Sequence, residues 1–311
     1  MQLPPKLWFR LERLKALWRS FFAAGNQSYD ASHRMCPECR ALIARDAKVC
    51  PLCGARTGPM RARGNATPGA GRIMGVIPTP TSVTSILVAA NIAIYAVEWY
   101  LTENAGGPGA GSGLIGGIRT EVMLRLGAKF GPLMFAGEWW RLVTAMFLHA
   151  GLLHIGFNLW CLFDVGPEVE SLFSATKFTV LYLATGVIGF IVSLWWRPMT
   201  LSLGASGAIL GLIGILIGAS FHHGHVGKEY RSQLWRWVIY IFVFGLFFSV
   251  DNAAHLGGLV SGFILGYLIP EGQPETRPSE NLWNALAVLS ILIIAGSFAL
   301  MALQINRPLI F

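Results

Sequence analysis

The stretch Gly204-Ala-Ser206-Gly207-Ala-Ile-Leu-Gly211 places a serine between glycines inside an apolar segment, about residues 201–220. That segment is long enough to cross a bilayer as a helix. The serine has two interpretations. Small residues let membrane helices pack closely, and Gly207-x-x-x-Gly211 is such a pattern. Alternatively, Ser206 is a nucleophile, which requires a base beside it and space for a substrate carbonyl. Polar residues in other apolar segments decide between these interpretations.

The composition is that of a membrane protein. Of the 311 residues, 54% are hydrophobic and 13% are charged, whereas about a quarter of the residues in soluble domains are charged. The basic charge is concentrated in residues 1–79, which contain 13 Lys and Arg against 4 Asp and Glu. This favours anionic lipid and the cytoplasmic side of the membrane, so we expect no nucleic-acid partner.

Residues 1–25 are predicted to form a basic amphipathic helix. Apolar residues recur there at helical spacing with Arg and Lys between them; Pro4 and Pro5 precede the pattern and Gly25 follows it. We expect the helix to lie on the cytoplasmic leaflet or, alternatively, to pack on a partner domain.

Residues 31–57 resemble a zinc ribbon. Cys36-Pro-Glu-Cys39 is followed, after ten residues, by Cys50-Pro-Leu-Cys53. Two tight turns that each present two thiolates suit tetrahedral zinc, and about 25 residues cannot bury a core without a metal. We predict a structural zinc with no open position for catalysis, and a cytosolic protein partner for this module is a separate hypothesis. Residues 58–79, rich in Gly, Pro and Arg, are predicted to be a flexible linker.

Seven apolar segments follow the extension. They lie at about residues 83–101, 142–163, 178–196, 201–220, 235–250, 253–269 and 283–303. A cytoplasmic N-terminus satisfies the positive-inside rule, mainly through the basic extension. We therefore expect a multi-pass protein of a bacterial inner (plasma) membrane. The connection at about 102–141 contains apolar residues as well as glycines, which suggests that part of it lies in or on the outer leaflet.

Four polar residues fall in the outer half of three spans that run in the same direction. Ser206 is expected about a turn and a half into the fourth span, and His255 near the start of the sixth. His154 and Asn158 are expected three to four turns into the second span, on one face because they are four residues apart. Polar residues inside a membrane are costly and indicate function, so a convergent site is predicted.

Glycines recur every four residues after His255, at 258, 262 and 266. This face should pack closely on Gly207 and Gly211 and bring the His255 ring to Ser206. Asp251 either orients His255 or, the interpretation we favour, caps its helix. His149 is expected at the interface with water.

Four motifs together resemble those of the rhomboid intramembrane serine proteases. They are Gly204-Ala-Ser206-Gly207, Ala254-His255-Leu-Gly-Gly258, the spacing His149-x4-His154-x3-Asn158, and Trp140-Arg141. The resemblance implies an all-α polytopic bundle with a six-helix core at residues 80–270 and a seventh transmembrane helix at 281–304.

The resemblance also implies the chemistry. Ser206 would be the nucleophile and His255 the general base, without a third acid or a catalytic cofactor. The side chains of His154 and Asn158, with the Ser206 N–H, would form the oxyanion hole, and Arg141 would be structural. Some members carry an aromatic residue one turn after the serine, where this chain has Leu210.

The function implied is cleavage of single-span or polytopic membrane protein substrates within the lipid bilayer. A non-proteolytic rhomboid-like protein that binds membrane clients is the alternative, but loss of the serine or histidine would have favoured it. A third hypothesis is a transporter. It predicts two repeated halves with interrupted helices, which the sequence does not clearly contain.

Overall fold

The structure is a computed structural model. It describes residues 33–35, 42–44, 47–50, 54, 72–73, 77–78, 83–105, 117–247, 250–272 and 276–307. The chain divides into two compact units, Met1–Ile77 and Pro78–Phe311. The predicted amphipathic helix at 1–25 and the predicted zinc ligands Cys36, Cys39 and Cys53 lie outside the described residues.

The described parts of the first unit include short paired strands. β1 (His33–Met35) and β2 (Leu42–Ala44) are antiparallel, with Met35 opposite Leu42, so the first Cys-x-x-Cys pair belongs to the connection between them. β3 (Arg72–Ile73) and β4 (Ile77–Pro78) pair at the end of the predicted linker. Cys50 is buried, and its carbonyl accepts a hydrogen bond from the Gly54 N–H at 2.9 Å.

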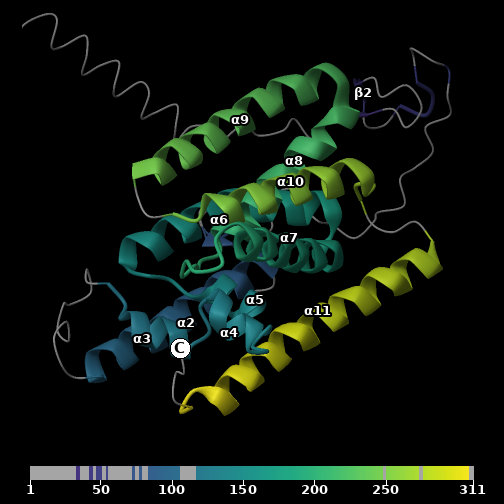
Figure 1. The fold of residues 1–311 in the computed structure, drawn as a ribbon. Coiled ribbons are helices and arrows are strands. Elements are labelled where there is room, and N and C mark those ends of the chain that lie inside the picture. The colour runs from purple at the N-terminus through teal and green to yellow at the C-terminus, as the bar shows by residue number, and fades with distance from the viewer. Residues whose placement is uncertain are drawn as a thin grey trace, which may run out of the picture. The chain divides into compact units, whose positions relative to one another are not determined.

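From Val83 onward, the named elements of the second unit are all helices. Its elements are α2 (Val83–Asn104), α3 (Thr120–Arg125), α4 (Gly131–Phe135), α5 (Arg141–Thr144), η1 (Ala145–Phe147), α6 (Leu152–Phe173), α7 (Ala175–Trp196), α8 (Ser206–Ala219), η2 (Ser220–His223), α9 (Gly224–Phe247), α10 (Asn252–Leu268) and α11 (Arg277–Gln304). Figure 1 shows α8 and α10 side by side within the bundle, with α9 along one edge and α11 along the opposite edge.

Among the described helices, α2, α7, α8 with η2, and α11 are long and apolar enough to cross a membrane. The other three long helices fall short for separate reasons. The second half of α6 carries Asp164, Glu168 and Glu170, the first half of α9 is polar, and α10 has 17 residues. Exposed Leu, Ile and Val side chains run along α11, as expected of a helix that faces lipid. The prediction of a helical, polytopic membrane protein is confirmed.

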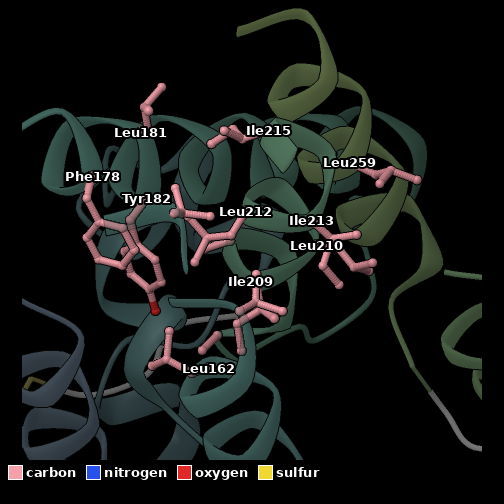
Figure 2. Packing of buried hydrophobic residues seen from close by; sticks show 14 of the residues in the cluster. Leu162, Phe178, Leu181, Tyr182, Ile209, Leu210, Leu212, Ile213, Ile215 and Leu259 are labelled. Atoms are coloured by element: carbon pink, nitrogen blue, oxygen red, sulfur yellow. The ribbon is translucent and has the colours of Figure 1, made fainter. Parts of the chain in front are cut away.

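The apolar core surrounds α8, in which every residue after Ser206 is buried. Figure 2 shows how side chains from neighbouring helices meet those of α8: Leu162 of α6 and Tyr182 of α7 lie near Ile209 and Leu212. A helix that is apolar on all sides must be enclosed by other helices, which explains the central place of α8.

Glycines let α8 and α10 touch backbone to backbone. A methyl carbon built at Gly258 would lie 2.0 Å from the carbonyl oxygen of Gly207, and one at Gly262 would lie 2.0 Å from that of Gly211. The predicted close packing of these two faces is confirmed. It places the first turns of α8 and α10 beside each other.

Two predicted spans begin later than expected. The second was predicted from residue 142, but α5 and η1 occupy 141–147 and α6 begins at Leu152. The fourth was predicted from residue 201, but α8 begins at Ser206. Both differences arise because the preceding backbone pairs with the first connection: Gly151 bridges to Gly117, and Ser202 bridges to Lys129. Tertiary hydrogen bonds therefore override the apolar composition that favoured helix.

Candidate active site at three helix starts

Ser206 and His255 meet at the starts of α8 and α10. The Nε2 atom of His255 lies 2.7 Å from Oγ of Ser206, a normal hydrogen-bond distance. Ser206 is the first residue of α8 rather than lying a turn and a half into a span, and His255 is in the first turn of α10, as expected. The imidazole is 3% exposed. The histidine is thus buried, whereas the serine that it contacts is partly exposed.

His154 lies next to this pair, at the third residue of α6 rather than three to four turns into a span. Gly204 marks the contact: a methyl carbon built there would lie 2.8 Å from Nε2 of His154 and 3.7 Å from Oγ of Ser206. Gly204 also has φ of +124°, a conformation that favours glycine. A glycine is therefore required here both for the backbone path and for the space between His154 and Ser206.

The local backbone sets the orientation of the His154 ring. The Ala150 N–H donates to Nδ1 of His154 at 3.3 Å. A neutral imidazole that accepts at Nδ1 carries its proton on Nε2. Consequently the nitrogen that faces Gly204 is the donor.

Asn158 lies one turn further along α6 and is also buried. Its amide nitrogen donates to the His154 carbonyl oxygen at 2.9 Å, which uses one of its two N–H groups. The structure brings His154, Ser206 and His255 together, and it places Asn158 on the same helix as His154, one turn below the contact.

Asp251 caps α10 and does not orient the His255 ring. Its Oδ1 atom accepts from the N–H groups of Ala253 and Ala254, both at 3.1 Å. Among the described residues, Nδ1 of His255 has no hydrogen-bond partner. The predicted cap is confirmed.

An aromatic ring does contact His255, from a helix that the sequence did not indicate. The rings of Phe242 in α9 and His255 are 6.0 Å apart between centroids and nearly perpendicular. Leu210, which has the position of the aromatic residue found in some rhomboids, is buried in the core. No sequence signal distinguishes Phe242 from the other apolar residues of α9.

His149 is not at the water interface as predicted. Its side chain is fully buried, with its ring 5.2 Å from that of His154. The reason is that its N–H donates to both carboxylate oxygens of Glu98 in α2, at 3.1 and 3.0 Å, which draws this turn into the bundle. Glu98 lies within a predicted span, and an acidic residue inside an apolar segment is a sequence signal from which it could have been identified.

The first connection is held against neighbouring segments by two buried cations. Arg141 is buried and donates to the carbonyl oxygens of Leu124 and Ala128 and to Glu138. Lys129 is fully buried, and burial lowers the pKa of its ammonium group while the charge of Asp251 acts in the opposite direction. These buried cations fix the connection against the residues that precede α6 and α8.

The fold and the site together define a class: a helical membrane protein in which a serine hydroxyl contacts an imidazole at the starts of two packed helices. Residues 136–271 match the Rhomboid domain family. The chain is 36% identical over 139 residues to the putative rhomboid protease YdcA of Bacillus subtilis, across 42% of this chain and 68% of that protein. The chain belongs to the rhomboid family, whose members are generally intramembrane serine proteases.

Two longer relatives are similar over more of this chain. Identity to the rhomboid protease GluP of B. subtilis is 35% over 208 residues, across 65% of this chain and 38% of GluP. Identity to the mitochondrial RHOMBOID-like protein 6 of Arabidopsis thaliana is 31% over 203 residues, across 58% of this chain and 65% of that protein. The chain therefore spans less than two thirds of the length of either relative.

Proposed function

We propose that this protein is a serine endopeptidase that cleaves transmembrane segments within the bilayer, with Ser206 as the nucleophile and His255 as the general base. The observation that carries this proposal is the 2.7 Å contact between Oγ of Ser206 and Nε2 of His255 in a partly buried site. The position of His255 is suited to proton transfer, because a general base must lie within hydrogen-bond reach of the proton it abstracts.

The reaction begins as Oγ of Ser206 attacks the scissile carbonyl carbon and its proton passes to Nε2 of His255. The resulting imidazolium then gives that proton to the leaving amine, which leaves an acyl-enzyme on Ser206. In the second half, His255 takes a proton from water, the hydroxide attacks the ester, and the proton returns to Ser206. No group beyond this pair and water is required for proton transfer.

Charge on the substrate oxygen is stabilised by the proposed oxyanion hole. The Nε2–H of His154 is supported as a donor by the Ala150 N–H at its other nitrogen. The second N–H of Asn158 and the backbone N–H of Ser206 complete the set. Removal of one such donor in serine proteases costs about 100- to 1,000-fold in turnover.

The substrates are single-span or polytopic membrane proteins, because the proposed catalytic pair is enclosed by helices that face lipid. A helix must unwind locally to present a peptide bond to Ser206, since its carbonyl groups are otherwise engaged within the helix. Residues that weaken a helix near the cleavage site should therefore favour cleavage.

The test is a cleavage assay in reconstituted membranes on a generic single-span substrate. We expect the wild-type protein to produce two fragments, and Ser206→Ala and His255→Ala to produce none. Ser297→Ala is the matched control, because this serine lies in α11 and bonds only to its own helix, to the Ile293 carbonyl oxygen. If Ser206→Ala cleaves as well as the wild type, the proposal is wrong. If the wild type retains the substrate uncleaved, the non-proteolytic alternative is favoured.

We also propose that the extension lies on the cytoplasmic side of a bacterial inner membrane and carries a structural zinc ion. The described residues fit a zinc ribbon in two respects: β1 and β2, which precede and follow the first Cys-x-x-Cys pair in the sequence, are antiparallel, and Cys50 is buried with its carbonyl oxygen accepting from the Gly54 N–H. Cys36, Cys39, Cys50 and Cys53 would hold the ion, which would supply folding energy and no catalysis.

The zinc proposal has its own readout. The purified protein should contain about one zinc per chain by elemental analysis, and Cys36→Ser with Cys39→Ser should remove it. Wild-type protein without zinc after expression in zinc-supplemented medium would contradict the proposal. A protein partner bound at the ribbon should be lost with the same substitutions.

A further inference from the structure

Asp251 contacts more than the helix it caps. Its Oδ1 atom takes both capping N–H groups, whereas Oδ2 accepts the hydroxyl of Ser193 at the end of α7. The hydroxyl of Ser202 lies near the same carboxylate. A cap alone requires one oxygen, so the contacts with Ser193 and Ser202 need a separate explanation.

The two serines lie on the path of the chain to Ser206. Ser193 is buried in the last turn of α7, and Ser202 is four residues before Ser206. His255 is four residues after Asp251, and its N–H donates to the Asp251 carbonyl oxygen at 3.1 Å. One carboxylate therefore joins the segment that leads to the proposed nucleophile with the turn that carries the proposed base.

Lys129 fixes the same segment from the other side. Its backbone exchanges two hydrogen bonds with Ser202, at 2.9 and 3.0 Å. Its ammonium group donates to the carbonyl oxygens of Ser193, Arg197 and Thr200 at 3.4, 2.8 and 3.1 Å. The connection from α7 to α8, which is not helical at 201–205, is thus held by a buried cation and a carboxylate of opposite charge.

We propose that Asp251 is a positioning residue, which sets the distance between Ser206 and His255 by tying the start of α10 to Ser193 and Ser202. The inference rests on the proposed function, because it assigns a task to Asp251 only if the pair is reactive. Asp251 does not touch the reacting atoms. It acts through the two segments that carry them.

The structure separates capping from tethering, since the two tasks use different oxygens of Asp251. Ser193→Ala with Ser202→Ala removes the tether and leaves both capping bonds. Asp251→Asn keeps Oδ1 for the cap, whereas Asp251→Ala loses both tasks. Ser297→Ala together with Ser290→Ala is the matched control, because each of these hydroxyls bonds only within α11.

The experiment measures kcat and KM on a transmembrane substrate, the rate at which a fluorophosphonate probe labels Ser206, and the thermal unfolding midpoint in detergent. We expect the Ser193/Ser202 double variant to lose about tenfold in kcat and in labelling rate, because misplacement by a fraction of an ångström is costly in a preorganised site. Its KM should stay within about twofold of the wild-type value. Asp251→Ala should lose more and unfold at a lower temperature, and Asp251→Asn should recover the unfolding temperature.

Wild-type kcat and labelling in the Ser193/Ser202 variant would overturn the inference, even if Asp251→Ala is impaired, because Asp251 would then be only a cap. If that double variant does not fold, the two single variants decide by the same measurements. A wild-type protein that neither cleaves nor labels would overturn the proposed function itself. If the wild-type protein cleaves and is labelled, and the double variant does so equally well, only the proposed role of Asp251 as a tether is overturned.

Discussion

Gly262 allows a direct test of whether the contact between α8 and α10 sets the activity. In Gly262→Ala, the new methyl carbon would lie 2.0 Å from the carbonyl oxygen of Gly211 and 2.7 and 2.9 Å from the carbonyl carbon and Cα of that residue. All three atoms are backbone, so no side chain can rotate away. Ordinary contact begins near 3.4 Å, and the helices must separate locally by about 1.4 Å.

The cost of this separation can be estimated from similar overpacking in protein cores, about 1–3 kcal/mol. For a domain of this size each kcal/mol lowers the unfolding midpoint by roughly 2–4 °C, so we expect a decrease of about 2–12 °C. Because α8 begins with Ser206 and α10 carries His255 two turns before Gly262, separation should also lengthen the 2.7 Å contact of the pair. Displacement of about 1 Å can reduce turnover about 100-fold.

Gly296→Ala is the matched control, since it makes the same change in α11, where a methyl carbon at Gly296 meets no atom within 4 Å. Alanine favours a helix over glycine by about 0.8–1 kcal/mol, so this variant should be at least as stable as the wild type. The assays are thermal unfolding in detergent and cleavage in liposomes. If Gly262→Ala matches Gly296→Ala in both, close packing of these helices does not position the pair.

Substitutions at three further positions probe contacts that the structure adds to the motif. Phe242→Ala removes the ring against His255, and because such aromatic contacts contribute about 0.5–1.5 kcal/mol, kcat should decrease about 2- to 12-fold; an unchanged kcat would exclude a role for the ring. Glu98→Leu leaves the His149 N–H without its acceptor, which should cost about 1–3 kcal/mol in thermal unfolding, and Glu98→Gln should recover most of it; equal loss in both variants would show that the charge matters instead. Gly204→Ala forces a methyl group between His154 and Ser206 at a positive φ, so cleavage should disappear, and retained cleavage would contradict this geometry.

The sequence was sufficient to predict the helices and the pairing of their small faces, because both depend on local periodicity. Glycines four residues apart mark a face that can approach another backbone, and the contact of Gly258 and Gly262 with α8 followed from that pattern. The cap at Asp251 was equally local, since an acidic residue just before an apolar helix is a favoured cap.

The helix starts could not be predicted, because they depend on partners far along the chain. Residues 201–205 are apolar enough to extend α8, but Ser202 pairs with Lys129, and the Gly204 N–H donates to the carbonyl oxygen of Ala145 at 2.8 Å. Similarly, the sequence predicted His149 at the interface with water, because it did not indicate that Glu98 accepts a hydrogen bond from the His149 N–H. The contact of Phe242 with His255 depends on how α9 lies against α10, which no local pattern specifies.

The displaced helix starts explain why the proposed site lies where it does. The first N–H groups of a helix have no hydrogen-bond acceptor within the helix, and the lipid interior contains no water that could accept from them. In α10 the Asp251 side chain satisfies two of them. In α8, by contrast, the residue before Ser206 is an alanine, and no side-chain cap closes the first turn. The helix of the proposed base is thus capped, whereas the helix of the proposed nucleophile has no side-chain cap, so its first N–H groups and the positive end of its dipole lie at Ser206. If Ser206 lay a turn and a half into a continuous helix, its N–H would be bonded within that helix and could not stabilise the oxyanion. The break at 201–205 is therefore a condition for the proposed chemistry.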